Sequence, residues 1–264
     1  ASAGADSFRR ERTLGELLAE ARAQVEHVKG LAEDASVTAR EAAAQKRAAK
    51  EREKRIERAL EELPKIRESK KTEEDKKEAR ASTTDPEARV MKMGDGGFRP
   101  AYNIQFATTT EEKVIVGVGV TNSGSDKNEL GPMLEQIEER TGERPKEMLV
   151  DGGFVKLEEI ARAAEKGTTT YAPVPTKKGE EPDYHAKPTD SEAIAAWRQR
   201  MGTSEAKAIY KERGETAELP NAHVKSRFGL TQLPVRGMQK ALTVSVWMGL
   251  TYNVLRWISL AAST

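Results

Sequence analysis

The chain has 264 residues, of which 33% are charged and 37% hydrophobic, and this polar balance indicates a long solvated helical segment beside any compact core. The formal net charge of +1 argues against an indiscriminate polycation, so a nucleic-acid surface would have to come from local clustering of basic residues. No cysteine is present, which excludes disulfides, zinc fingers and thiol catalysis and fits a reducing cytoplasm.

A heptad pattern occupies the N-terminal quarter of the chain. From Leu14 to Ala32 apolar residues recur in alternating steps of four and three, and a second run from about Ser36 to Leu63 continues this spacing. Pro64 is expected to end the second helix. We therefore expect a helical hairpin with a coiled-coil seam over residues 1–66 and a charged linker over residues 67–81. A solvated hairpin without chemistry of its own is favoured over a direct DNA-binding arm.

The composition changes at Ser82, and residues 82–264 alternate between strand and helix patterns. Strand patterns occupy residues 102–106, 114–121, 148–151 and 168–174. Helix patterns occupy residues 132–140, 157–166, 190–201, 203–213 and 237–260. The most apolar stretch of the chain, residues 241–255 within the last of these helices, is too short and too polar to span a bilayer, so it is expected to be a core helix. This order of elements predicts an α/β layer architecture.

A short apolar run, Met148-Leu149-Val150, ends in Asp151 and is followed at once by two glycines. Ligands and catalytic groups gather at the carboxyl ends of strands in open α/β sheets, so Asp151 is a candidate functional residue. An aspartate at this position is also a common helix cap or turn former, and both interpretations stay open from the run alone.

A spaced motif follows between residues 210 and 225, where Tyr210, Arg213, Glu218 and Lys225 are separated by two, four and six residues. The chain here resembles the DDE-type transposases of bacterial insertion sequences, whose last acidic residue lies in such a signature on a helix. Six other segments carry the same resemblance, namely 82–89, 102–105, 114–122, 132–135, 151–154 and 197–213. The resemblance covers essentially the whole chain after Ser82. It implies an RNase H-like mixed sheet that lacks its first strand, with the helical hairpin as an insertion near the N-terminus.

The resemblance also implies the chemistry. Asp151 and Glu218 match the second and third acids of the family and are the expected ligands of Mg²⁺ or Mn²⁺, since hard divalent cations prefer oxygen ligands and a metal pair can clamp an in-line displacement. Tyr210, Arg213 and Lys225 match residues that contact phosphates or brace the helix, and Arg213 suits a bidentate phosphate contact. The best local basic cluster joins Lys225 to Arg227, Arg236 and Lys240, with a solvated face as the competing interpretation.

Three features depart from the family pattern. Four residues separate Arg213 from Glu218, where three are commoner in the broad superfamily. The family's first aspartate ends a strand ahead of the hairpin, and that strand is expected upstream of Ala1. Asp85, in a Thr-Asp-Pro turn, is the alternative first acid within the chain, whereas Asp6 follows no strand pattern. In addition, Gly214 and Pro220 bracket Glu218 and would weaken or kink a regular helix.

Three functions remain open at this point. The first is a DNA transposase, here a fragment, that cleaves and transfers strands of double-stranded DNA at inverted-repeat ends, as a homodimer in the bacterial cytoplasm and without a membrane partner. The second is a catalytically inactive, DNA-binding or interfering relic of such an enzyme. The third, a coiled-coil scaffold with an α/β domain, leaves the spacing of the Tyr210 motif to chance.

Overall fold

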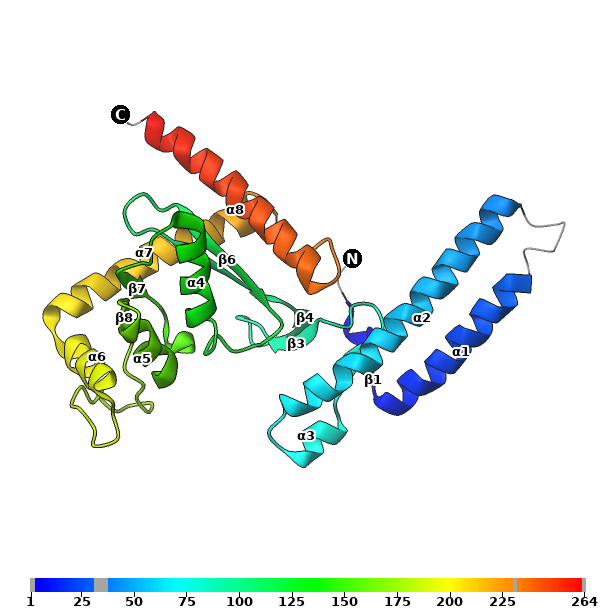
Figure 1. Ribbon diagram of the computed structural model, residues 1–264, viewed down its shortest axis with the longest axis horizontal. Coiled ribbons are helices and arrows are strands. Elements are labelled where there is room, and N and C mark those ends of the chain that lie inside the picture. Colours follow the sequence, from blue (N-terminus) through cyan, green and yellow to red (C-terminus); the bar gives the residue numbers. More distant parts are fainter. Residues whose placement is uncertain (1–2, 31–37, 230–231, 263–264) are drawn as a thin grey trace. The chain divides into compact units, whose positions relative to one another are not determined.

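The computed structural model describes residues 3–30, 38–229 and 232–262, and the chain divides into two units. Unit 1 comprises residues 1–102 and 233–241, and unit 2 comprises residues 103–232 and 242–264. Figure 1 shows the elements of each unit along the chain. The predicted ends of the two hairpin helices near Ala32 and Ser36 lie outside the described residues.

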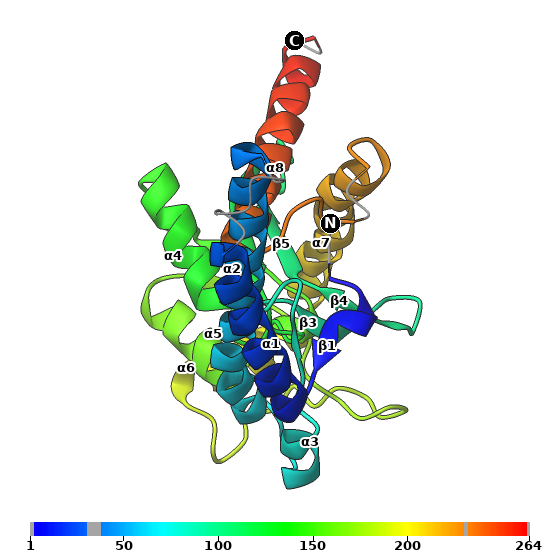
Figure 2. The same cartoon turned by 90° about the vertical axis from the view of Figure 1, so that its right-hand side faces the viewer.

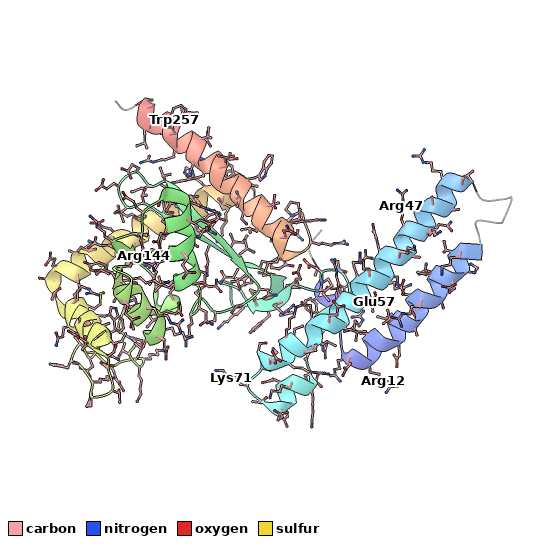
Figure 3. All side chains as sticks on the ribbon, viewed as in Figure 1. Arg12, Arg47, Glu57, Lys71, Arg144 and Trp257 are labelled. Carbon is pink, nitrogen blue, oxygen red and sulfur yellow. The ribbon has the colours of Figure 1, made fainter. Side chains whose placement is uncertain are left out.

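Unit 1 is built on two helices, α1 (Glu11–Gly30) and α2 (Ala39–Glu68). Leu14 near the start of α1 packs with Leu63 near the end of α2, whereas Val25 near the end of α1 packs with Ala49. The helices therefore run antiparallel, as Figure 1 shows. Glu57 of α2, labelled in Figure 3, accepts a hydrogen bond of 2.9 Å from Arg22 of α1 across the pair.

The expectation that Pro64 ends its helix is wrong, because α2 continues through Pro64 to Glu68. A proline inside a helix removes one backbone hydrogen bond and clashes with the preceding turn. Here the flanking residues Leu63 and Ile66 are both buried in the cluster shared with α1, and this packing offsets the cost. The charged run of residues 67–81 contains a further short helix, α3 (Glu73–Lys77), which Thr72 caps.

The remaining elements of unit 1 are a short 3₁₀ helix, η1 (Ala5–Ser7), and two small antiparallel sheets. One sheet pairs β1 (Phe8–Arg9) with β2 (Ala81–Ser82), and the other pairs β3 (Arg89–Lys92) with β4 (Phe98–Ala101). The glycine-rich segment 94–97 is thus the turn of a hairpin that the strand patterns missed. Gly96 has φ of +83°, a conformation that glycine adopts without strain.

Unit 2 confirms the mixed α/β architecture. Its strands form an antiparallel pair, β5 (Asn103–Thr108) with β6 (Ile115–Thr121), and a parallel pair, β7 (Glu147–Leu149) with β8 (Thr169–Tyr171). Its helical elements are α4 (Leu130–Thr141), η3 (Gly152–Phe154), α5 (Leu157–Glu165), α6 (Glu192–Gly202), α7 (Ser204–Ser226) and the part of α8 (Met238–Ala261) from Leu242 onward. The largest buried cluster surrounds Trp197, which is fully buried among residues of α4, α5, α6 and β8.

Gly117 confirms the prediction that the glycines of β6 leave room for a close neighbour. A Cβ at Gly117 would lie 2.4 Å from Met133 Sδ and 3.1 Å from Ala107 Cβ. We expect Gly117→Val to lower the free energy of unfolding of unit 2 by about 1–3 kcal/mol, the usual cost of overpacking a core. Gly214→Ala, inside α7 with no atom near the added Cβ, should instead raise it by about 0.4–1 kcal/mol. Urea unfolding of both variants checks this pair, and an unchanged midpoint for Gly117→Val would show that Met133 moves aside.

Helix α8 is not the core helix that the sequence predicted, because much of its apolar surface is exposed. Its small residues Ala241, Ser245 and Gly249 are the buried side, and a Cβ at Gly249 would be 3.4 Å from Val118 of β6. The predicted apolar stripe lies exposed on the helix, with exposed fractions of 36–61% for Leu242, Val246, Leu250, Val254 and Ile258. Trp257, labelled in Figure 3, is also 69% exposed.

Polar contacts explain why the small side of α8 docks on the β5–β6 hairpin. Asn253 bonds both the backbone N–H and the C=O of Ile115, at 2.8 and 2.7 Å, and the Tyr252 hydroxyl donates to the Lys113 carbonyl. These bonds fix the rotation of the helix, so the larger apolar side chains face away. Despite this apolar surface, the described part of the chain contains no helix long and apolar enough to cross a membrane.

Candidate functional site

A cavity of about 1080 Å³ in unit 2 contains the candidate acids. Its lining includes Asp151 after β7, Glu218 on α7 and a third carboxylate, Asp126, in the loop after β6. Asp151 and Glu218, separated by 67 positions in the chain, therefore border the same space. In Figure 2 the strand β5, which also lines the cavity, lies between α4 and α7.

Asp151 lies where the sequence places it, two residues beyond the end of β7. Its side chain caps the 3₁₀ turn η3 by accepting a hydrogen bond of 2.7 Å from the Gly153 backbone. The capping interpretation of Asp151 is thus correct, and it is compatible with a site role because only Oδ1 takes part in this bond. The side chain is partly exposed and lines the cavity.

Asp126 is an acid of the cavity that the sequence patterns missed. Its Oδ1 accepts hydrogen bonds from the side-chain amides of Asn103 and Gln105, at 2.6 and 2.5 Å, so β5 holds the carboxylate in place. A Cβ at Gly153 would lie 2.9 Å from Asp151 Oδ1 and 3.0 Å from Asp126 Oδ2, so these two oxygens are within 5.9 Å of each other. The available signal was an acid in a serine- and glycine-rich turn directly after a strand, the same pattern that marked Asp151.

The Asp126 carboxylate also affects its neighbour Glu129, at the start of α4. Burial raises the pKa of Glu129 above its ordinary value, the Asp126 charge adds to this effect, and a hydrogen bond from Thr121 opposes it. The Asp126 carboxylate thus lies close enough to Glu129 to disfavour the charged form of that side chain.

Glu218 lies exposed on α7, a single helix that Thr203 caps as predicted. The helix is continuous through both Gly214 and Pro220. Pro220 is among the fully buried residues, and its packing offsets the missing backbone bond. Glu218 is therefore presented from a regular helix to the cavity.

Two basic residues of the motif share this cavity. Arg213 and Lys225 both line it, and the Arg213 guanidinium stacks 5.6 Å from the centre of the Tyr210 ring. Tyr210 itself packs against the large buried cluster, so it braces Arg213 from the protein side. The buried Nε of Arg213 has no hydrogen-bond partner among the described residues. Arg213 and Lys225 thus add positive charge to a space whose lining contains five carboxylates, those of Asp126, Glu143, Glu147, Asp151 and Glu218.

The other basic residues are distributed over both units. Arg227 is exposed at the C-terminal end of α7, in unit 2. Arg236 and Lys240 belong to unit 1, in the segment that leads into α8 and in its first turn. Their joint role in binding DNA stays a prediction.

Asp85, the alternative first acid, is a buried residue of unit 1 with an exposed fraction of 2%. Its Oδ1 accepts the Tyr102 hydroxyl at 2.8 Å, and its Oδ2 accepts the Gly237 backbone N–H at 3.1 Å. Both oxygens therefore hold together segments that are far apart in the sequence, which accounts for a buried carboxylate without any catalytic role. A catalytic role for Asp85 remains a prediction.

The Asp85–Tyr102 bond predicts an alkaline instability of unit 1. Burial, and then the hydrogen bond to Asp85, raise the pKa of Tyr102 above its ordinary value near 10. The folded protein keeps this proton at a pH where the unfolded chain loses it, so the stabilisation is complete below about pH 10 and declines as the pH rises further. Hydrogen exchange of the backbone amides of unit 1, measured in urea between pH 8 and 11, should show this decline in stability. Tyr102→Phe should reduce it, whereas Tyr184→Phe in unit 2 should leave it unchanged.

Oxygen ligands of the kind that a divalent cation prefers line the cavity. No group of three or more metal-ligating side chains comes together within residues 3–30, 38–229 and 232–262. Mg²⁺, however, is commonly held by one or two carboxylates together with water and phosphate oxygens. The pair Asp126 and Asp151, with Oδ2 of Asp126 free of the amide bonds, fits such a site, and Glu218 borders the same space.

Comparison with curated proteins and with solved structures finds no significant match. A family model does match, and it covers residues 65–254, well over half of the chain. That range includes Asp126, Asp151, Glu218 and the whole cavity. The chain therefore belongs to the family described as the transposase DDE domain.

Proposed function

We propose that this protein carries the catalytic core of a DNA transposase that cleaves and transfers strands at the ends of an insertion sequence. The single observation that supports this most is that Asp151 and Glu218, 67 positions apart, line one cavity in a chain of the transposase DDE domain family. In this proposal the partner is double-stranded DNA, bound by a homodimer in the bacterial cytoplasm. Residues 82–264 would form the RNase H-like core, with residues 1–66 as a coiled-coil insertion and residues 67–81 as the linker.

The proposed roles follow from the geometry of the cavity. Asp151 and Glu218 would hold Mg²⁺ or Mn²⁺, and Asp126 would assist as a third carboxylate fixed by Asn103 and Gln105. When bound, the metal supplies Lewis-acid stabilisation of the oxygens at the reacting phosphate. Arg213 and Lys225 would bind phosphate oxygens beside these acids, and Tyr210 would keep the Arg213 guanidinium in place.

The alternative function is a DNA-binding relic without activity. It is favoured by the lack of a three-residue metal-ligating group among the described residues, since a two-metal site needs a shared ligand. Both alternatives keep the basic residues of α7 for binding DNA, so binding alone does not separate them.

Paramagnetic broadening by Mn²⁺ tests the site itself. If Asp151 and Glu218 share an ion, Mn²⁺ should broaden the backbone amide resonances of Gly153 and of Ala217 at the same metal concentration. Asp151→Asn should weaken the broadening at both positions by about 10-fold or more in Mn²⁺ concentration, whereas Glu212→Gln, an exposed acid elsewhere on α7, should not change it. Broadening of only one of the two amides, or broadening that Asp151→Asn leaves unchanged, would contradict a shared ion.

A further inference from the structure

The side of α8 that faces away from β6 carries an apolar stripe with heptad spacing. Four large residues follow one another along it in steps of three, four and three and are 45–70% exposed, namely Trp247, Leu250, Val254 and Trp257. Because one helical turn takes 3.6 residues, these positions lie opposite the buried Ala241, Ser245 and Gly249. We call these four residues the outer stripe. Trp257, near the end of the helix, is labelled in Figure 3.

The outer stripe exposes a large apolar area. Its two tryptophans are 70% and 69% exposed, and an aromatic side chain removes about 150–250 Å² from water when it is buried. Together with the neighbouring Ile258, which is 54% exposed, the stripe presents on the order of 600 Å² per chain. This area is at the upper limit of the apolar patches that monomers leave exposed, and it approaches the roughly 800 Å² that each partner buries in a stable interface.

The outer stripe carries no charge. Between Leu242 and Ala261 the helix contains one charged residue, Arg256, and its Nε donates a hydrogen bond of 2.7 Å to the Glu112 carbonyl in the turn between β5 and β6. Arg256 is therefore held on the docked side of the helix. A surface that binds nucleic acid needs Lys or Arg for the phosphates, and a helix that lies on a lipid surface carries them on its polar face. The outer stripe has neither property and fits another apolar helix instead.

The order of residues along the outer stripe is symmetrical about Tyr252. The two tryptophans lie five positions on either side of Tyr252, and the leucine and the valine lie two positions on either side. The heptad spacing continues to two small exposed residues, Thr243 and Ala261, each nine positions from Tyr252. Two such helices that run antiparallel about a two-fold axis level with Tyr252 would therefore match tryptophan with tryptophan, leucine with valine, and Thr243 with Ala261.

We propose that the outer stripe binds a second copy of this chain, as an antiparallel pair of α8 helices about a two-fold axis level with Tyr252. A two-fold contact uses the same patch on both chains, so the patch must be complementary to its own inverted copy, as the symmetrical order of the outer stripe is. The inference names the contact surface of the homodimer in the proposed function, and it rests on that function only for the biological role of the dimer.

The mass of the full chain in solution tests the contact. Sedimentation equilibrium should give twice the 29.1 kDa of one chain. Leu250→Glu should raise the dissociation constant of the dimer by about 100-fold or more, because it buries two carboxylates about one helical turn apart beside the two-fold axis. Leu157→Glu is the matched control, since Leu157 is an exposed residue in the first turn of α5, where the helix dipole favours an acid. It should leave the dissociation constant unchanged.

Cysteine crosslinking tests the orientation of the two helices, because the chain contains no cysteine of its own. In the antiparallel pair Thr243 lies opposite Ala261 of the second copy, whereas the two copies of Thr243 are 18 positions apart, or about 27 Å along the helices. A thiol crosslinker that spans about 10 Å, the distance between the axes of packed helices, should therefore join Thr243→Cys to Ala261→Cys when both variants are coexpressed. It should not join either variant to itself.

Three results would overturn the proposal. They are a parent chain that stays monomeric at about 100 μM, where a micromolar contact is saturated, a dimer that Leu250→Glu leaves intact, and crosslinking of either cysteine variant to itself. Circular dichroism checks that Leu250→Glu still folds, as expected for a side chain that is 61% exposed. None of these measurements involves DNA or a metal ion. A monomeric chain would thus leave the proposed catalytic site standing, and a failed Mn²⁺ test would leave the dimer standing.

Discussion

Joining an apolar strand that ends in Asp-Gly to the chain is expected to produce Mg²⁺-dependent nicking of supercoiled DNA, which the chain as given should lack. The strand would supply the first acid that the family resemblance implies, as a further carboxylate beside those of Asp151 and Glu218, which line the cavity. Metal stabilisation of a reacting phosphate is worth several kcal/mol, and each 1.4 kcal/mol is a factor of ten in rate. We therefore expect at least about a 100-fold gain in nicking rate, measured on plasmid DNA with the strand attached to Ala1 through a flexible glycine–serine linker.

The controls for this result distinguish an effect of the carboxylates from an effect of the added strand on folding. Asn in place of the new Asp, Asp151→Asn and Glu218→Gln should each remove the gain, whereas Glu212→Gln on the same helix should keep it. Robust nicking by the chain without the added strand would contradict the prediction. In that case the first acid would be a residue already present in the chain. Loss of nicking in one of three variants would identify it, namely Asp126→Asn, Asp85→Asn or Asp6→Asn.

DNA binding by the chain as given should depend steeply on salt. If Arg213, Lys225 and Arg227 each neutralise one phosphate, the logarithm of the affinity falls with a slope near −0.9 per contact against the logarithm of the salt concentration. Three contacts then correspond to a loss of about 40-fold between 50 and 200 mM salt. Fluorescence anisotropy with a labelled duplex measures this directly.

Single substitutions test which residues make these contacts. Lys225→Gln and Arg227→Gln should each reduce the magnitude of the slope by about 0.9 without a change in sequence preference. Lys178→Gln, in the exposed loop before α6, should leave the slope unchanged. A slope near zero in the parent chain would exclude a phosphate-binding surface on α7.

The local elements of the fold were determined by the sequence itself. Alternation of apolar residues predicted β5, and a more buried apolar run predicted β6. Gly142, with φ of +79°, ends α4 at the expected position. Thr203 caps α7, and Asp151 follows its strand. These features depend on a few neighbouring residues, whose backbone preferences and hydrogen bonds act within one turn or one strand, and so they can be derived from the order of residues alone.

The candidate site could be predicted only in part. Asp151 and Glu218 were chosen from a strand end and a spaced motif, but the structure alone shows that they line one cavity. Asp126 stayed hidden because its position depends on amide bonds from Asn103 and Gln105, which are more than twenty positions away. Contacts at this distance are set by how the strands and helices pack, and no local pattern encodes them.

Tertiary packing likewise decided the features that local rules got wrong. Pro64 stays inside α2 because its neighbours Leu63 and Ile66 are buried against α1. The larger apolar residues of α8 face outward because Asn253 and Tyr252 bind the β5–β6 hairpin and fix the rotation of the helix. The pairing of β5 with β6 and of β7 with β8 was likewise known only from the structure, since hydrogen bonds between strands join residues that lie apart in the sequence.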